Sequence, residues 1–150
     1  MREYNVTIPD LLSRSELFCE LPAVVLNDIA GICREVKVSK GEVVFRIGDL
    51  SKDVYILAEG SMELGYGLIS ADESKPGTIR EPGEFFGWGA LAGEGNYRLI
   101  NAMAVQETQL IIVDGVQLMN FLEGQPAAGF RFIRKLLAII LNRIVAMTAT

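Results

Sequence analysis

The sequence predicts a mainly β fold with flanking helices, in the form of a sandwich, barrel or jelly roll. Three observations support this prediction. Apolar and polar residues alternate with period two through most of 33–113, in seven or eight short runs. Turns that contain glycine bound these runs. The period of a helix appears only before and after this region, so we do not expect a parallel sheet with crossover helices.

Composition indicates one domain, spanning residues 1–150, and restricts its partners. The chain has 150 residues, of which 50% are hydrophobic, which is enough for a substantial core. It carries 14 basic and 19 acidic side chains, giving a formal charge of −5. Nucleic-acid surfaces need clustered Lys and Arg to contact phosphates, so we expect no nucleic-acid binding by this domain.

The residue types present argue against an enzyme and against a metal centre. Histidine is absent, which removes imidazole metal sites and Ser–His or Cys–His nucleophile pairs. Cys19 and Cys33 are far apart in the chain, and we expect two free, buried thiols in a reducing cytosol. No apolar run approaches the length of a membrane span, and the start of the chain lacks a signal peptide. We therefore expect a cytoplasmic chain without membrane contact.

Two short helices are expected within about 8–32. Pro9 suits the first turn of a helix, and Ser13 with Glu16 has the spacing of a capping box. Pro22 opens the second helix, whose apolar residues fall on one side. These residues are Val25, Leu26, Ile29 and Ile32.

The β-roll is expected within about 33–113. Expected strands lie at 35–39, 42–47, 53–58, 61–69, 78–80, 99–105 and 109–113. The polar segment 70–77, closed by Pro76-Gly77, is expected to be an exposed hairpin loop. A short non-strand piece is expected at 88–92.

Two helices are expected within about 115–147, the first at 116–122 and a long one from about residue 127. The long helix carries two apolar stripes: Phe130, Ile133, Leu137, Ile140, Ile144 and Met147 in one, and Phe132, Leu136, Ile139, Leu141 and Val145 in the other. One apolar stripe can pack on the helix's own domain, and the other must be buried against something else. We expect a homodimer through this helix, the alternative being a helix buried wholly within its own domain.

The segment 81–104 carries the residues best suited to bind a ligand. A Pro-Gly turn leads to Phe85-Phe86, four glycines follow within 87–95, and then comes Arg98. Dense glycine lets the backbone approach a ligand closely, and a guanidinium can grip a phosphate with two parallel hydrogen bonds. The alternative is a glycine-rich connection with Arg98 in solvent.

Several motifs together resemble the cyclic nucleotide-binding domain family, which includes the catabolite activator protein and the regulatory subunits of cAMP-dependent protein kinase. The matching stretches are LFxxL at 17–21, KGEVVFRIGD at 40–49, VYILxxGSMEL at 54–64 and PGEFFG at 82–87. The resemblance covers about 11–147. It implies an eight-stranded double-stranded β-helix, or jelly roll, with short N-terminal helices and a long C-terminal dimerisation helix.

The resemblance also implies a phosphate-binding cassette, which this chain matches only in part. In the family, a glutamate after Phe-Gly takes the ribose 2′-hydroxyl, and Trp88 stands there in this chain. Loss of that hydrogen bond should weaken binding about ten- to hundredfold. Leu99 stands where a small residue is usual, and Asn101 where Ser or Thr is expected. The candidate ligand-binding residues are Gly87, Trp88, Gly89, Ala90, Arg98 and Leu99.

The functional hypotheses follow from this partial match. The first is a sensor module that binds cAMP, cGMP or another anionic small molecule and relays binding through the C-terminal helix. The alternative is a module without nucleotide binding that serves dimerisation or docking. A third hypothesis, a cupin-type enzyme, is not expected because cupins need a histidine-rich metal cluster and this chain has no histidine. In bacterial activators a DNA-binding domain follows the long helix, and both a stand-alone module and a fragment of a longer regulator fit this chain.

Overall fold

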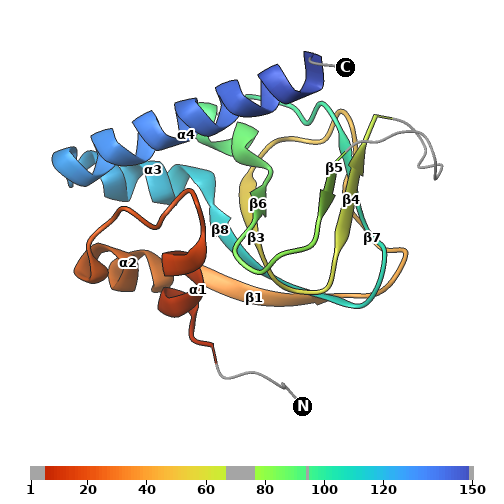
Figure 1. Ribbon diagram of the computed structural model, residues 1–150, viewed down its shortest axis with the longest axis horizontal. Coiled ribbons are helices and arrows are strands. Elements are labelled where there is room, and N and C mark those ends of the chain that lie inside the picture. Colours follow the sequence, from red (N-terminus) through yellow and green to blue (C-terminus); the bar gives the residue numbers. More distant parts are fainter. Residues whose placement is uncertain (1–5, 67–76, 94, 149–150) are drawn as a thin grey trace.

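A computed structural model describes residues 6–66, 77–93 and 95–148. Two four-stranded antiparallel sheets face each other, in the orders β1-β8-β3-β6 and β2-β7-β4-β5 (Figure 1). The strands are β1 (Cys33–Val38), β2 (Val43–Phe45), β3 (Asp53–Glu59), β4 (Met62–Gly65), β5 (Gly77–Ile79), β6 (Phe85–Phe86), β7 (Asn101–Ala104) and β8 (Thr108–Asp114). This arrangement confirms the predicted eight-stranded jelly roll.

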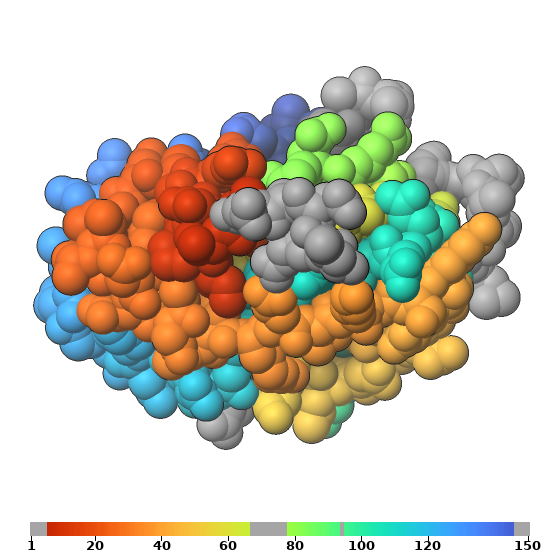
Figure 2. All heavy atoms as spheres, turned by 90° about the horizontal axis from the view of Figure 1, so that it is seen from below, coloured from red at the N-terminus to blue at the C-terminus, as the bar shows by residue number. Residues whose placement is uncertain are grey.

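The described helices gather on the side of the β1-β8-β3-β6 sheet (Figure 1). They are α1 (Ile8–Arg14), α2 (Ala23–Ala30), the 3₁₀ turn η1 (Trp88–Ala92), α3 (Gly115–Glu123) and α4 (Pro126–Thr148). Seen from below, the red and orange N-terminal part of the chain occupies much of the near face, and the blue C-terminal part lies along its edge (Figure 2). Within the described part of the chain, the helices are too short or too polar to span a bilayer.

Two hydrophobic cores share the β1-β8-β3-β6 sheet. Along β3, Val54 and Ile56 face the helices, whereas Tyr55 and Leu57 face the interior of the roll. Successive side chains on a strand point to opposite faces, so a strand buried on both faces becomes a continuous apolar run. This burial explains why β3 lacks the polar alternation seen in β1.

The strand β6 was not expected. It consists of Phe85 and Phe86 alone, which pair with Ile56 and Tyr55 of β3. Phe85 belongs to the helix-side core and Phe86 to the roll interior. Two buried residues give no alternation to read, so the strand has no signature in the sequence. Its position matters, because it delivers the chain directly to Gly87.

The expected capping box at the first helix is wrong. Thr7 is the N-cap of α1, and its Oγ1 accepts a hydrogen bond from the Asp10 amide at 3.2 Å. Ser13 lies inside the helix, where its hydroxyl donates to the Asp10 carbonyl at 2.7 Å. A proline in the first turn requires the cap to precede it, so the helix begins at Ile8 and not near Ser13.

The expectation of two buried thiols is only partly right. Cys19 is exposed, because the buried positions of its segment are Leu17, Phe18 and Leu21. Cys33 is half-buried, and burial raises its pKa to about 12. Both cysteines are free.

The predicted hairpin loop lies almost wholly outside the described residues. Residues 70–76 fall there, together with 67–69 of the strand expected at 61–69. The described part of that strand is β4, which ends at Gly65, and Gly77 begins β5.

The long helix α4 has one face on its own domain and one face in solvent. Phe132, Leu136 and Ile139 are buried in the helix-side core. The exposed apolar residues of this helix are Phe130, Ile133, Leu137, Leu141, Ile144 and Val145. Phe130 is 64% exposed, so the alternative of a helix buried within its own domain is wrong.

Candidate functional site

The glycine-rich segment forms a tight connection from β6 back to the second sheet. After η1, residues 96–98 run beside the turn that follows β2. The Arg98 amide donates to the Asp49 carbonyl at 2.7 Å, and the Gly48 amide donates to the Arg98 carbonyl at 2.9 Å. The Ser51 amide donates to the Asn96 carbonyl at 2.8 Å. These backbone hydrogen bonds hold Arg98 in place independently of its side chain.

Gly87 lies directly against the Arg98 side chain, the Asp53 carbonyl and Tyr55. It has φ +80°, in the left-handed region that favours glycine. A Cβ at this position would lie 3.0 Å from both Arg98 Nη1 and the Asp53 carbonyl oxygen, and 3.1 Å from Tyr55. A side chain here would therefore displace the arginine.

The Arg98 side chain is buried, with only 5% of its surface exposed. Nη1 donates to the Gly87 carbonyl at 3.0 Å, and Nη2 donates to the Asp53 carbonyl at 2.7 Å. The guanidinium carbon lies 4.0 Å from the centre of the Phe45 ring and 5.8 Å from that of Tyr55. The alternative of a solvent-facing Arg98 is wrong.

The charge of Arg98 is not balanced by an ion pair. Its guanidinium donates to two backbone carbonyls and lies close to the Tyr55 hydroxyl, and its Nε is buried without a partner among the described residues. Burial lowers the pKa of the guanidinium, while the nearby Tyr55 and Asp53 act in the opposite direction. Asp53 and Asp49 offset part of this charge from a distance, but neither forms an ion pair with the guanidinium, so this position still favours the arrival of an anion.

Three aromatic rings occupy the roll interior beside Arg98. Tyr55 stacks on Phe86 with ring centres 5.1 Å apart, and Phe45 lies 5.7 Å from Tyr55 and 6.2 Å from Phe86. The guanidinium of Arg98 therefore lies among aromatic rings, in contact with Phe45 and near Tyr55.

The other candidate residues occupy three different environments. Trp88 is half-buried and packs against the helix-side core, away from the roll interior. Ala90 is buried against Gly115 at the start of α3, and a Cβ on Gly89 would lie 3.2 Å from Ser51 Oγ. Leu99 is 78% exposed. The structure thus brings Gly87 and Arg98 together and places Trp88, Ala90 and Leu99 elsewhere.

Sequence reasoning missed the residues that surround the guanidinium. Phe45 and Tyr55 face the roll interior, and Asp53 lies at the start of β3, where its carbonyl accepts from Arg98. The period-two pattern could have placed Phe45 on the interior face. The contact between Asp53 and Arg98 spans 45 residues and has no local signal.

Asp53 adds a second buried polar atom to this region. Its Oδ1 is buried without a partner, and its Oδ2 lies 3.9 Å from Arg34 Nη2. Burial raises its pKa, with Asp114 opposite it in the sheet acting in the same direction, while Arg34 and Lys52 lower it. A raised pKa means that the ionised form is less stable in the folded chain than in the unfolded chain.

This shift predicts a pH-dependent effect of Asp53→Asn. The stability due to the neutral carboxyl is present at low pH and is lost as the pH rises through the raised pKa. We expect the variant to match the wild type near pH 3 and to be more stable by roughly 0.5–1 kcal/mol near pH 7. Urea unfolding at both pH values measures this difference, with the exposed Asp28→Asn as control. A variant that is less stable near pH 7 would show that the carboxylate is well accommodated.

Comparison with known proteins identifies the family. The family model described as cyclic nucleotide-binding domain matches residues 35–125. The chain belongs to the cyclic nucleotide-binding domain family. A relative from Rhodopseudomonas palustris, named "Putative potassium channel protein", is 31% identical over 118 residues. That match covers 78% of this chain and 27% of the relative, so the chain spans about a quarter of its length.

Solved structures show the same family fold. A "Putative Cyclic nucleotide-binding protein" from Geobacter metallireducens has a TM-score of 0.75 at 26% identity, covering 91% of this chain and 97% of that one. The regulatory domain of Toxoplasma gondii PKA, crystallised with cAMP, has a TM-score of 0.62 at 25% identity, covering 73% and 41%. The Thermus thermophilus catabolite activator protein has a TM-score of 0.73 at 24% identity, covering 89% and 60%, which shows the shared fold.

Proposed function

We propose that this cyclic nucleotide-binding domain is a sensor module that binds a small anion, cAMP or cGMP by family relation, at the 87–98 cassette. The environment of the Arg98 side chain is the observation that supports this proposal. Its guanidinium is buried, has no ion-pair partner among the described residues, and leaves Nε without an acceptor. A cyclic phosphate supplies the missing negative charge and acceptor oxygens.

Binding requires an exchange of partners at the guanidinium. Nη1 and Nη2 now donate to the Gly87 and Asp53 carbonyls, and the ligand must take at least one of these bonds. A phosphate offers the guanidinium a full negative charge and bidentate geometry, whereas the two carbonyls offer only dipoles, so the exchange is favourable for the arginine. The aromatic rings beside it must also move, which lowers the affinity.

Trp88 stands where family members have the glutamate that binds the ribose of the nucleotide. Its side chain packs with the helix-side core, so it supplies no acceptor for a ribose hydroxyl beside Arg98. We therefore expect phosphate recognition to dominate, with a weaker affinity than that of a complete cassette.

The packing of η1 supports a relay to the C-terminal helices. Ala90 and Leu91 belong to the same core cluster as Leu118 of α3 and Phe132 of α4. Gly115, the first residue of α3, has no space for a side chain because Ala90 lies directly against it. Movement of η1 on ligand binding would therefore shift α3, and α4 with it.

A second contact links the cassette to the distal half of α4. The Arg143 guanidinium carbon lies 5.0 Å from the ring centre of Phe85, two residues before Gly87. Burial lowers the pKa of Arg143, whereas Glu16 and Glu84 oppose that change. The helix is thereby fastened to the strand that leads into the cassette.

The exposed apolar face of α4 supports a homodimer as the receiver of this relay. Leu137 and Ile144 are 57% and 50% exposed and lie two turns apart on the helix. A symmetric copy of the same helix would cover both. We propose that ligand binding changes the packing of this dimer.

One observation favours the alternative of a module without nucleotide binding. The rings of Phe45, Tyr55 and Phe86 pack against one another in the roll interior, and Arg98 lies against the Phe45 ring. Titration calorimetry with cAMP and cGMP at millimolar concentration distinguishes the two functions. Saturable heat supports the sensor, and an absence of heat for both nucleotides supports the alternative.

A further inference from the structure

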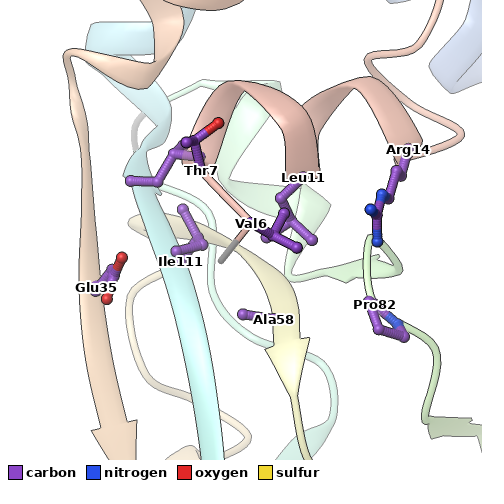
Figure 3. A pocket seen from close by; sticks show the side chains of 9 residues that line it. Val6, Thr7, Leu11, Arg14, Glu35, Ala58, Pro82 and Ile111 are labelled. Carbon is purple, nitrogen blue, oxygen red and sulfur yellow. The ribbon is translucent and has the colours of Figure 1, made fainter. Parts of the chain in front are cut away.

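A cavity of about 160 Å³ lies between α1 and the helix-facing side of the β1-β8-β3-β6 sheet (Figure 3). Val6 and Leu11 line it from the side of α1, and Ala58 and Ile111 line it from the sheet. Pro82, in the turn before β6, closes one side. The walls are therefore mainly apolar, and none of these residues belongs to the cassette.

The cavity exists because of a small residue in β3. The helix-facing row of this strand runs Val54, Ile56 and Ala58, so the last position carries only a methyl group. The pairing of β3 with β8 shifts register between Leu57 and Glu59, which places Ala58 at a bulge. The helix α1 above it ends at Arg14 and does not fill the space.

Charged side chains lie at opposite sides of the cavity. Figure 3 shows Arg14 beside Pro82, and Glu35 on the far side at β1. Arg14 is exposed and forms no ion pair within the described part of the chain. Glu35 already accepts a hydrogen bond from Gln109 Nε2 at 2.9 Å. Glu16, Glu81 and Glu84 line the adjacent cavity on the other side of Arg14. An anion in the cavity of Figure 3 is therefore attracted by the Arg14 guanidinium and repelled by Glu35 and, from farther away, by these acids.

The volume fits a compact apolar group. An apolar cavity of about 150 Å³ in another protein stays dry and binds benzene. We propose that this cavity binds a small monocarboxylate whose apolar body is about the size of benzene. The body lies between Leu11, Ala58 and Ile111, and the carboxylate lies at the guanidinium of Arg14.

The position of this second site connects it to the turn that precedes the cassette. Gly83 has φ +97°, and a Cβ there would lie 3.2 Å from the Arg14 carbonyl oxygen, so the turn packs tightly on the end of α1. A ligand in the cavity would rest against Pro82 of the same turn. The cavity is a different site from the cassette, and ligand binding in it does not depend on nucleotide binding.

Methyl NMR of the chain titrated with benzoate tests the proposal. We expect saturable shifts of the Leu11, Ala58 and Ile111 methyl signals, with a dissociation constant in the range of about 1 mM. Arg14→Gln should weaken benzoate binding about three- to fivefold and leave benzyl alcohol unchanged, because only the carboxylate contacts the guanidinium. Arg46→Gln, at an exposed arginine remote from the cavity, should change neither.

Filling the cavity provides a second, independent variant. Ala58→Val should abolish the benzoate shifts while the variant keeps its circular dichroism spectrum. The proposal is overturned if the wild type shows no methyl shifts at about 20 mM benzoate, or if a folded Ala58→Val binds like the wild type. If Ala58→Val does not fold, equal benzoate affinities for wild type and Arg14→Gln overturn the assignment of the carboxylate.

Discussion

Replacement of Arg98 is expected to remove ligand binding while leaving a folded chain. Arg98→Met keeps an apolar stem on the Phe45 ring and loses the charge and all donors. Hydrogen bonds to charged groups contribute about 1.5–3 kcal/mol each, so we expect at least about a hundredfold loss of affinity for cAMP or cGMP. Titration calorimetry measures this loss.

Two further variants separate charge from geometry. Arg98→Lys keeps a positive charge but not the planar fork, so its affinity should fall between those of wild type and Arg98→Met. Arg46→Met, at an exposed arginine, should bind like the wild type. Binding by Arg98→Met with the affinity of the wild type would show that the guanidinium is not the anion site.

The same substitution also lowers stability. Arg98→Met leaves the Gly87 and Asp53 carbonyls without their donors, which costs about 1–3 kcal/mol for each buried acceptor that finds no water. Removal of a buried, unpaired charge offsets part of this cost. Urea unfolding should therefore show a net loss smaller than the sum of the two bonds, and calorimetry must be run where the variant is fully folded.

Leu137→Glu is expected to convert a dimer to a monomer. Leu137 is 57% exposed on α4, whereas Phe132 and Leu136 are buried. In a symmetric helix pair the substitution places two carboxylates in an apolar interface, each without a partner, which costs several kcal/mol. We expect at least a hundredfold weaker association, measured by light scattering after size exclusion.

The matched control for this prediction is Val24→Glu. Val24 is 66% exposed on α2, and the same charge change there should leave the dimer intact. Neither variant should lower the stability of the isolated monomer, because both side chains face away from the core. A wild-type chain that is monomeric at about 100 µM would contradict the proposed dimer, since stable helical dimers associate well below this concentration.

Period-two alternation and turn glycines were sufficient to predict most of the roll. They located β1, β2 and β8 because these strands contain alternating or bounded apolar runs. They did not locate β6, whose two phenylalanines are both buried. The spacing of apolar residues in α4 indicated two apolar faces but assigned some residues to the wrong one. Ile140 packs against the core, whereas Leu141 and Val145, expected beside Phe132 and Leu136, are exposed.

The environment of Arg98 could not be predicted from its neighbours. Tyr97 and Leu99 are 59% and 78% exposed, whereas the arginine between them is 5% exposed. In an extended segment Arg98 must face the side opposite to Tyr97 and Leu99. Hydrophobicity alone would bury Tyr97 and Leu99 and leave Arg98 in solvent, which is the reverse of what the structure shows. The decisive contacts come from the carbonyls of Gly87 and Asp53 and from the ring of Phe45, which are distant in the sequence.

The Nε–H resonance of Arg98 tests the central proposal most directly. This group is buried without an acceptor, so a bound phosphate should shift its signal strongly. We predict a saturable shift on titration with cAMP or cGMP, with the same dissociation constant as calorimetry, and loss of the signal in Arg98→Lys identifies the resonance. A signal that stays unmoved while calorimetry shows saturation would place the anion elsewhere and contradict the assignment of Arg98.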